Sequence, residues 1–148
     1  MDFVNEYKNR GGRVCAGSDS GFMYQVYGFG LIRELELLQE AGFTPLEVLR
    51  AATYAGAELM GIDTDVGTLE VGKCADLLVH DANPLDDFKM LYGSGAMRLN
   101  DDTRDLDWKR CLRLTICDGV IYDTAELLAD VERMVADSRT HEGAKVPA

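Results

Sequence analysis

Apolar residues recur at helical spacing through most of the first 62 residues. The pattern predicts four helical segments, at residues 2–10, 30–41, 44–55 and 57–60. The second has the clearest apolar stripe, formed by Leu31, Leu35 and Leu38. The third opens with a capping box at Thr44, followed by proline at the first helical position and glutamate at the third. These helices are therefore expected to carry apolar faces that need to be covered.

A short strand is predicted at Arg13–Ala16, between the glycine pair that ends the first helix and a polar loop at 17–21. A helix, a glycine turn, a buried strand and a polar loop make one unit of a parallel α/β fold. Such a strand is paired with parallel neighbours and covered on both faces. Residues 1–62 are therefore assigned to the α/β class.

The pattern changes after Ile62, where helical spacing gives way to turns and alternation. Glycines punctuate a turn-rich ribbon at 67–72. Strands are predicted at residues 75–80, 112–117 and 120–122. Asp118-Gly119 is a strong hairpin signal between the last two strands. Residues 63–122 are therefore expected to be mainly strands and turns.

The last segment, residues 123–148, is predicted to be a helix followed by a loose tail from residue 138. Asp123 suits the N-cap, and Glu126 occupies the third helical position. An apolar stripe follows at helical spacing, formed by Leu127, Leu128, Val131, Met134 and Val135. This stripe is expected to pack against a neighbouring element or a second subunit.

The formal net charge of −11 restricts the possible partners. Phosphate groups attract basic surfaces, so neither nucleic acid nor an anionic membrane surface is expected to bind. No apolar run is long enough to cross a bilayer, and the first residues lack the pattern of a secretory signal. Cys15, Cys74 and Cys117 lie among apolar residues and are predicted to be reduced core positions. A cytoplasmic location is therefore expected.

Residue types that bind metals are present, but not at metal-binding spacings. Four cysteines without a Cys-x-x-Cys pair and only two histidines make a closed zinc knuckle improbable. The acidic segment at 100–107 lacks the spacing and the glycine of a calcium-binding loop. It is predicted to be a solvated loop.

Several motifs along residues 10–122 occur in an order that is typical of one enzyme family. They are Gly17-Ser18-Asp19-Ser20-Gly21, the helical segments over 34–61, the ribbon and strand over 67–77, Asn83-Pro84-Leu85, and Asp118-Gly119. Together they resemble the last barrel strand, the following helices and the start of the small β-sandwich in amidohydrolase-superfamily enzymes. The amino-acid sequence of these helices resembles most the imidazolonepropionase and prolidase-like branch. Several motifs in one order make this resemblance specific.

The resemblance implies an α/β fold that is a C-terminal fragment of a (β/α)8 barrel of the TIM type plus part of a β-sandwich. Residues 1–62 would be the last barrel strand with its helices, and residues 63–122 the partial sandwich. Residues 123–148 would be a C-terminal helix and tail. The rest of the barrel and the sandwich strands contributed from upstream in the family are missing from this sequence.

By the same resemblance, Asp19 is both the catalytic residue and a metal ligand. Barrel enzymes place such residues at the C-terminal ends of their strands. There an aspartate binds the metal and accepts the proton of the attacking water. The alternative from the local sequence alone is a turn or N-cap aspartate, which is common beside glycine and serine. Ser18 and Ser20 are interpreted as loop hydrogen-bonding residues, because no histidine lies nearby in the sequence to activate them.

Most of the family's metal site is missing from this chain. It has no His-x-His motif, and neither His80 in a sandwich strand nor His141 in the tail matches a ligand position. Both are interpreted as satisfied or exposed histidines. One carboxylate cannot hold a catalytic zinc, which normally takes three protein ligands and a water. The complete enzyme is therefore expected to hold a divalent metal, with zinc preferred, and the isolated chain none.

The implied function is metal-dependent hydrolysis of an amide, a cyclic amide or a similar C–N bond in a small molecule, with this chain contributing only Asp19. The alternative is a non-catalytic fragment or subunit that docks on the missing part of the barrel. A third reading, an unrelated small α/β binding protein, is disfavoured by the ordered motifs. The isolated chain is expected to be inactive, and to self-associate or to pair with a complementing N-terminal fragment, because its apolar faces lack their neighbours.

Overall fold

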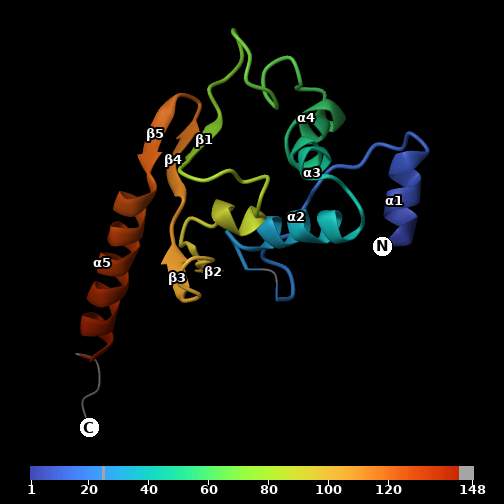
Figure 1. Ribbon diagram of the computed structural model, residues 1–148. Coiled ribbons are helices and arrows are strands. Elements are labelled where there is room, and N and C mark those ends of the chain that lie inside the picture. The colour runs from blue at the N-terminus through green and yellow to red at the C-terminus, as the bar shows by residue number, and fades with distance from the viewer. Residues whose placement is uncertain (25, 144–148) are drawn as a thin grey trace.

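The computed structural model describes residues 1–24 and 26–143, with side chains as far as Arg139 (Figure 1). Helices form the first half: α1 (Asp2–Asn9), α2 (Gly30–Glu40), α3 (Pro45–Ala52) and α4 (Tyr54–Met60). The second half contains β1 (Leu77–His80), the 3-10 helix η1 (Phe88–Leu91), β2 (Ala96–Leu99), β3 (Leu106–Lys109), β4 (Leu112–Cys117), β5 (Val120–Asp123) and α5 (Thr124–Gly143). The change from helices to strands after Ile62 therefore occurs where the sequence pattern changes.

Local sequence signals set the helix boundaries. The capping box predicted at Thr44 is formed, with the Thr44 N–H donating to Glu47 Oε2 at 2.8 Å and the Glu47 N–H donating to Thr44 Oγ1. The hydrogen bond from the Thr44 N–H and, after it, the one from Lys8 Nζ at 2.9 Å lower the pKa of the Glu47 carboxyl to about 2. α4 ends at Gly61, whose φ of +71° is in the left-handed region favoured by glycine. The four predicted helices in this half are present, but the third was predicted too long, because α3 ends at Ala52 and Ala55 belongs to α4.

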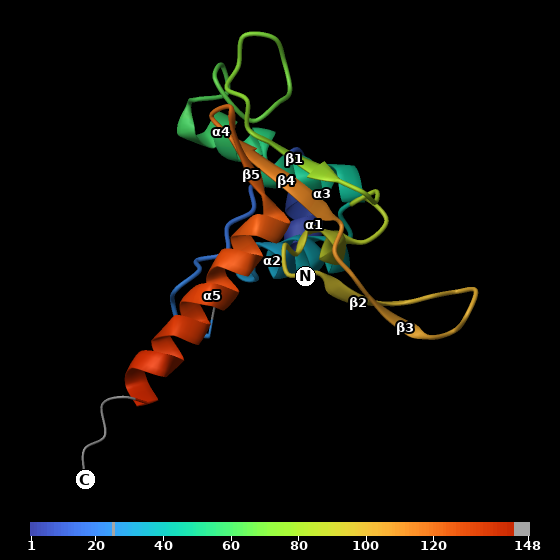
Figure 2. The same ribbon diagram turned by 90° about the vertical axis from the view of Figure 1, so that its left-hand side faces the viewer.

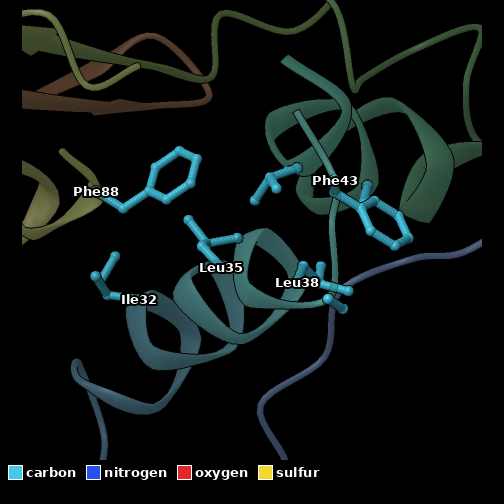
Figure 3. Packing of buried hydrophobic residues seen from close by; sticks show 8 residues of the cluster. Ile32, Leu35, Leu38, Phe43 and Phe88 are labelled. Carbon is cyan, nitrogen blue, oxygen red and sulfur yellow. The ribbon is translucent and has the colours of Figure 1, made fainter. Parts of the chain in front are cut away.

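The main core lies where α2 packs against α3 and η1 (Figure 3). Ile32, Leu35 and Leu38 of α2 are buried, and Leu35 is directed toward Phe88 of η1. Its other buried members are Ala41, Phe43, Val48 and Ala51. The predicted stripe was therefore wrong at one position, because Leu31 is exposed and the neighbouring Ile32 takes its place.

The strand predicted at Arg13–Ala16 is not formed. The segment is extended, with Val14 and Ala16 packed against the core and Arg13 and Cys15 exposed. A backbone hydrogen bond ties it to α3, because the Ala16 N–H donates to the carbonyl of Ala51 at 2.9 Å. The described residues provide no strand to pair with it, so it joins no sheet, and they contain no closed barrel. The described residues of this α/β chain thus lack the parallel strand pairing that the first unit predicts.

The burial predicted for three cysteines was also wrong, although they are free thiols as predicted. Cys15, Cys74 and Cys117 are exposed, whereas Cys111 is buried beside Met90 and Ala96. Apolar neighbours in sequence did not indicate burial, because neighbours along an extended segment face opposite sides. Cys15 shows this directly, since Val14 and Ala16 take the side that meets the core.

Two antiparallel sheets follow the helices. One has the strand order β1-β4-β5, and its β4–β5 hairpin turns at Asp118-Gly119, both with positive φ, as predicted. The other is the β2–β3 hairpin, which contains part of the acidic segment expected to be a loop. Asn100 closes that turn, because its N–H donates to the carbonyl of Asp105 at 2.8 Å and its side chain to Asp107. A sandwich of two packed sheets is not confirmed.

β1 forms one edge of the three-stranded sheet. Its Leu-Leu-Val-His sequence contains no lysine, proline or carboxylate, which are the residues that usually protect an edge from pairing with another strand. Leu78 is half exposed on this strand. The edge therefore lacks the residues that usually prevent pairing with a further strand.

α5 extends away from the body of the molecule, with its start packed against β4 and β5 (Figures 1 and 2). Asp123 caps it as predicted, accepting from the N–H groups of Ala125 and Glu126. A loose tail was predicted from residue 138. This prediction is wrong for residues 138–143, because α5 extends to Gly143. Residues 144–148 lie outside the described part. Among the described helices, none is both long and apolar enough to span a membrane.

The chain exposes far more surface than its mass predicts. Its accessible surface is 10,921 Å² for 16.3 kDa. A monomer of this mass normally exposes about 7,500 Å² by the usual scaling, which leaves an excess of roughly 3,000 Å². Many large apolar side chains contribute, among them Phe3, Tyr24, Leu69 and Val71. Exposed apolar side chains, which the sequence predicted for these helices, therefore contribute part of this excess.

Asp76 links the β4–β5 turn to the start of β1, because its Oδ1 accepts from the N–H of Asp118 at 2.7 Å. We expect Asp76→Ala to lower the free energy of unfolding by about 1 kcal/mol, the usual net value of one hydrogen bond. The Asp118 amide should also exchange faster with solvent. Amide exchange by NMR measures both effects, with Asp101→Ala on the β2–β3 turn as the control. Unchanged exchange at Asp118 would show that the bond contributes nothing.

Candidate functional site

Asp19 lies at the end of the extended segment 13–18, in the loop that leads to α2. Its φ of +47° is in the left-handed region, which aspartate tolerates better than most residues. The side chain is exposed, and the backbone carbonyl accepts from the N–H of Phe22 at 3.3 Å. The Ser18 and Ser20 hydroxyls are 2.7 Å apart, in agreement with their interpretation as loop hydrogen-bonding residues.

The residues around Asp19 do not by themselves fit a metal ion. Within residues 1–24 and 26–143, no group of three or more His, Cys, Asp or Glu side chains is placed to hold one. A catalytic zinc needs three protein ligands. Any metal role for Asp19 therefore requires ligands from outside the described residues.

The loop after Asp19 is unusually apolar for an exposed segment. Its exposed members are Phe22, Met23, Tyr24, Val26, Tyr27 and Phe29. Tyr27 folds back over Gly21, where a Cβ atom would overlap the tyrosine hydroxyl. Phe29 contacts the Tyr92 ring, with centroids 5.3 Å apart, which ties the loop to the main core. The apolar surface beside Asp19 is therefore held by local packing and stays exposed.

A cavity of about 670 Å³ lies between the α3–α4 helices and β1, within the roughly 300–1,000 Å³ range of small-molecule pockets. Its lining is mainly apolar and includes Leu49, Ala52, Met60, Leu77, Leu78 and His80. β1 contributes Leu77, Leu78 and His80 to its wall. Periodicity did not predict it, because it forms between segments distant in sequence.

His80 differs from its predicted role. Both ring nitrogens are buried, and neither has a hydrogen-bond partner among the described residues, so its interpretation as satisfied or exposed is wrong. Burial lowers the pKa of the imidazole from its ordinary 6.5, against the opposing charge of Asp81. The side chain of His141 lies outside the described side chains. The burial of His80 depends on tertiary packing, so no sequence signal could have shown it.

The ribbon over 67–77 has a structural role. Lys73 Nζ donates to the carbonyl of Asp63 and to Thr68 Oγ1, each at 2.6 Å, and its side chain is only 11% exposed. Gly67 lies so close to α4 that a Cβ atom would be 2.8 Å from the Cβ of Ala57. These residues hold the ribbon in place rather than supplying chemistry.

Comparison with protein families gives one match over most of the chain. A sequence model of the amidohydrolase family matches residues 2–122. The matched range includes Asp19, the helices α2–α4, the ribbon and the sheet up to β5. α5 lies beyond it.

Individual relatives match shorter stretches. A 5'-deoxyadenosine deaminase from Methanobrevibacter smithii is 34% identical over 91 residues, which are 62% of this chain and 20% of the relative. An imidazolonepropionase from Sphingopyxis alaskensis is 34% identical over 64 residues, 43% of this chain and 15% of the relative. The chain thus spans a fifth or less of these curated relatives.

A solved structure from Bifidobacterium longum, of a protein assigned as a prolidase, is also similar. It shares 37% sequence identity with a TM-score of 0.64, and the match covers 80% of this chain and 25% of that protein. The arrangement of helices and strands found here therefore recurs as one quarter of a larger fold.

Because the pKa of His80 is lowered in the folded state, the unfolded chain binds a proton more readily below about pH 6.5. The free energy of unfolding should therefore fall as the pH drops from 7.5 to 5.5. His80→Leu removes the buried imidazole and should flatten this dependence, as measured by urea unfolding at one protein concentration. Equal slopes for the two proteins would mean that His80 titrates normally.

Proposed function

Because the chain belongs to the amidohydrolase family, we propose that it forms part of a metal-dependent hydrolase that acts on a C–N bond in a small molecule. The substrate class is an amide, a cyclic amide or a similar group. The observation that carries this proposal is the family match over residues 2–122, with several family motifs in order. The named relatives, a deaminase and an imidazolonepropionase among them, support the same bond class.

In this proposal Asp19 is the residue of the chain that takes part in the chemistry. Its carboxylate would bind a divalent metal, with zinc preferred, together with ligands supplied by another part of the enzyme. The same carboxylate would accept the proton of the attacking water. Its exposure at the end of segment 13–18 supports the role, because a carboxylate that must meet ligands from elsewhere has to be accessible.

The partner in this proposal is a complementing polypeptide that supplies the rest of the barrel. Three observations support it. Val14 and Ala16 lie in an extended segment that joins no sheet. β1 has an unprotected edge beside a cavity of about 670 Å³. The excess surface of roughly 3,000 Å² on this chain is more than the roughly 1,000–2,500 Å² that each partner of an obligate complex buries.

The alternative is a non-catalytic subunit that docks on such a partner. The lack of a metal-binding group within the described residues favours it. The two functions share a docking surface and differ only in whether Asp19 supports turnover.

A first experiment tests the need for a partner. We expect the isolated chain to retain no stoichiometric zinc after gel filtration, as measured by mass spectrometry, and to self-associate. Mixed with the three quarters of the Bifidobacterium longum protein that it does not match, it should elute as a one-to-one complex. A monodisperse, cooperatively unfolding monomer, or zinc that is lost in Asp19→Asn, would contradict this.

A second experiment tests Asp19. We expect a chimera that replaces the matched quarter of the Bifidobacterium longum protein with this chain to act on that protein's own substrate. Asp19→Asn in the chimera should lower kcat on the order of 10²- to 10⁴-fold, because the amide keeps the shape but cannot accept the proton. Asp101→Asn is the matched control.

Loss of activity without loss of the thermal unfolding midpoint supports the catalytic role. Activity within a few-fold of the unsubstituted chimera would leave Asp19 as a loop residue. It would favour the docking alternative.

A further inference from the structure

α5 presents an apolar stripe that the rest of the described chain leaves uncovered. Leu127, Val131, Met134 and Val135 are 47%, 55%, 70% and 43% exposed. Their spacing puts them on one face of the helix. A lone helix of this length is marginal in water, because helices in proteins gain most of their stability from packing. The stripe therefore needs a covering.

The proposed barrel partner does not account for this stripe. The family match ends at residue 122, and α5 begins at Thr124. Both views show α5 directed away from the helices and sheets (Figures 1 and 2). The surface on α5 thus lies beyond the residues that the family model matches.

We propose that α5 pairs with α5 of a second copy of this chain in an antiparallel contact along the stripe. A two-fold contact uses the same patch on both subunits, so the patch must match itself. Uncharged side chains fill the stripe over two turns, so two copies can meet without burying a charge.

The charges along α5 select the antiparallel direction. Its first half, residues 124–132, carries Glu126, Asp130 and Glu132 and no basic residue. Its second half carries Arg139 and Arg133 beside two acidic residues, with Arg133 already paired with Asp130 of the same helix. Antiparallel pairing places the acidic half of one copy beside the half that contains the arginines of the other, whereas parallel pairing brings the two acidic halves together.

The available surface allows both contacts. A stable interface buries roughly 800 Å² on each partner. The excess surface of roughly 3,000 Å² exceeds that several-fold, so a helix contact and a barrel contact can coexist. The net charge of −11 on each copy is screened beyond about 8 Å at physiological salt and does not prevent the contact.

Two matched variants of the full chain test the proposal by light scattering coupled to gel filtration in physiological salt. Val131→Glu with Met134→Glu places two charges in the stripe and should halve the mass of the associated species while keeping the helical circular dichroism. Ala129→Glu with Ala136→Glu adds the same charges on the opposite face of α5 and should leave the mass unchanged. Equal masses for the two variants overturn the proposal.

A cross-linking measurement remains decisive if the chain also associates through other surfaces. With Cys15, Cys74 and Cys117 replaced by serine, Val131→Cys should give a disulfide-linked dimer on mild oxidation, because antiparallel helices bring the middle of the stripe close to its copy. Ala136→Cys, on the far face, should not. Equal cross-linking at the two positions, or none at either, rules out the α5 contact.

Discussion

The packing of α2 against α3 and η1 is the contact on which the order of this chain depends. Val48 is fully buried there, and the cluster around it joins residues from α2 to Phe88. This cluster also positions the segments that surround it. The Ala16 N–H bonds to the α3 carbonyl of Ala51, Phe29 reaches the core through Tyr92, and Lys8 lies 4.7 Å over the ring of Phe43. The position of Asp19 follows from this cluster, since the segment before it is held by Val14 and Ala16.

Features with a local cause could be predicted from the sequence. The capping box at Thr44 and the Asp118-Gly119 turn depend on residues within a few positions of one another, and both are present. The Asp123 cap has the same local origin. Features with a distant cause could not be predicted in this way. The orientation of Cys15 and the burial of the His80 ring nitrogens are set by segments far away in the chain.

The same distinction between local and distant causes applies to the candidate site. Asp19 could be picked out because glycine and serine flank it in a family pattern, but the metal role proposed for it depends on ligands that the described residues do not group around it. The failed strand at Arg13–Ala16 has the same origin, because a parallel strand is stable only when a neighbour pairs with it. Short-range sequence rules identify the aspartate, whereas long-range pairing determines whether it can take part in chemistry. The cavity beside β1 was missed for this reason too, since its walls come from both halves of the chain.

The unprotected edge of β1 bears on the abundance of this chain in a cell. An uncharged edge strand pairs readily with any extended segment it meets, including its own copies, so an excess of unpaired chains is prone to misassembly. Quality-control proteases and chaperones remove such species continuously. The steady-state abundance of this polypeptide would then follow the synthesis rate of whatever covers that edge, more than its own expression level.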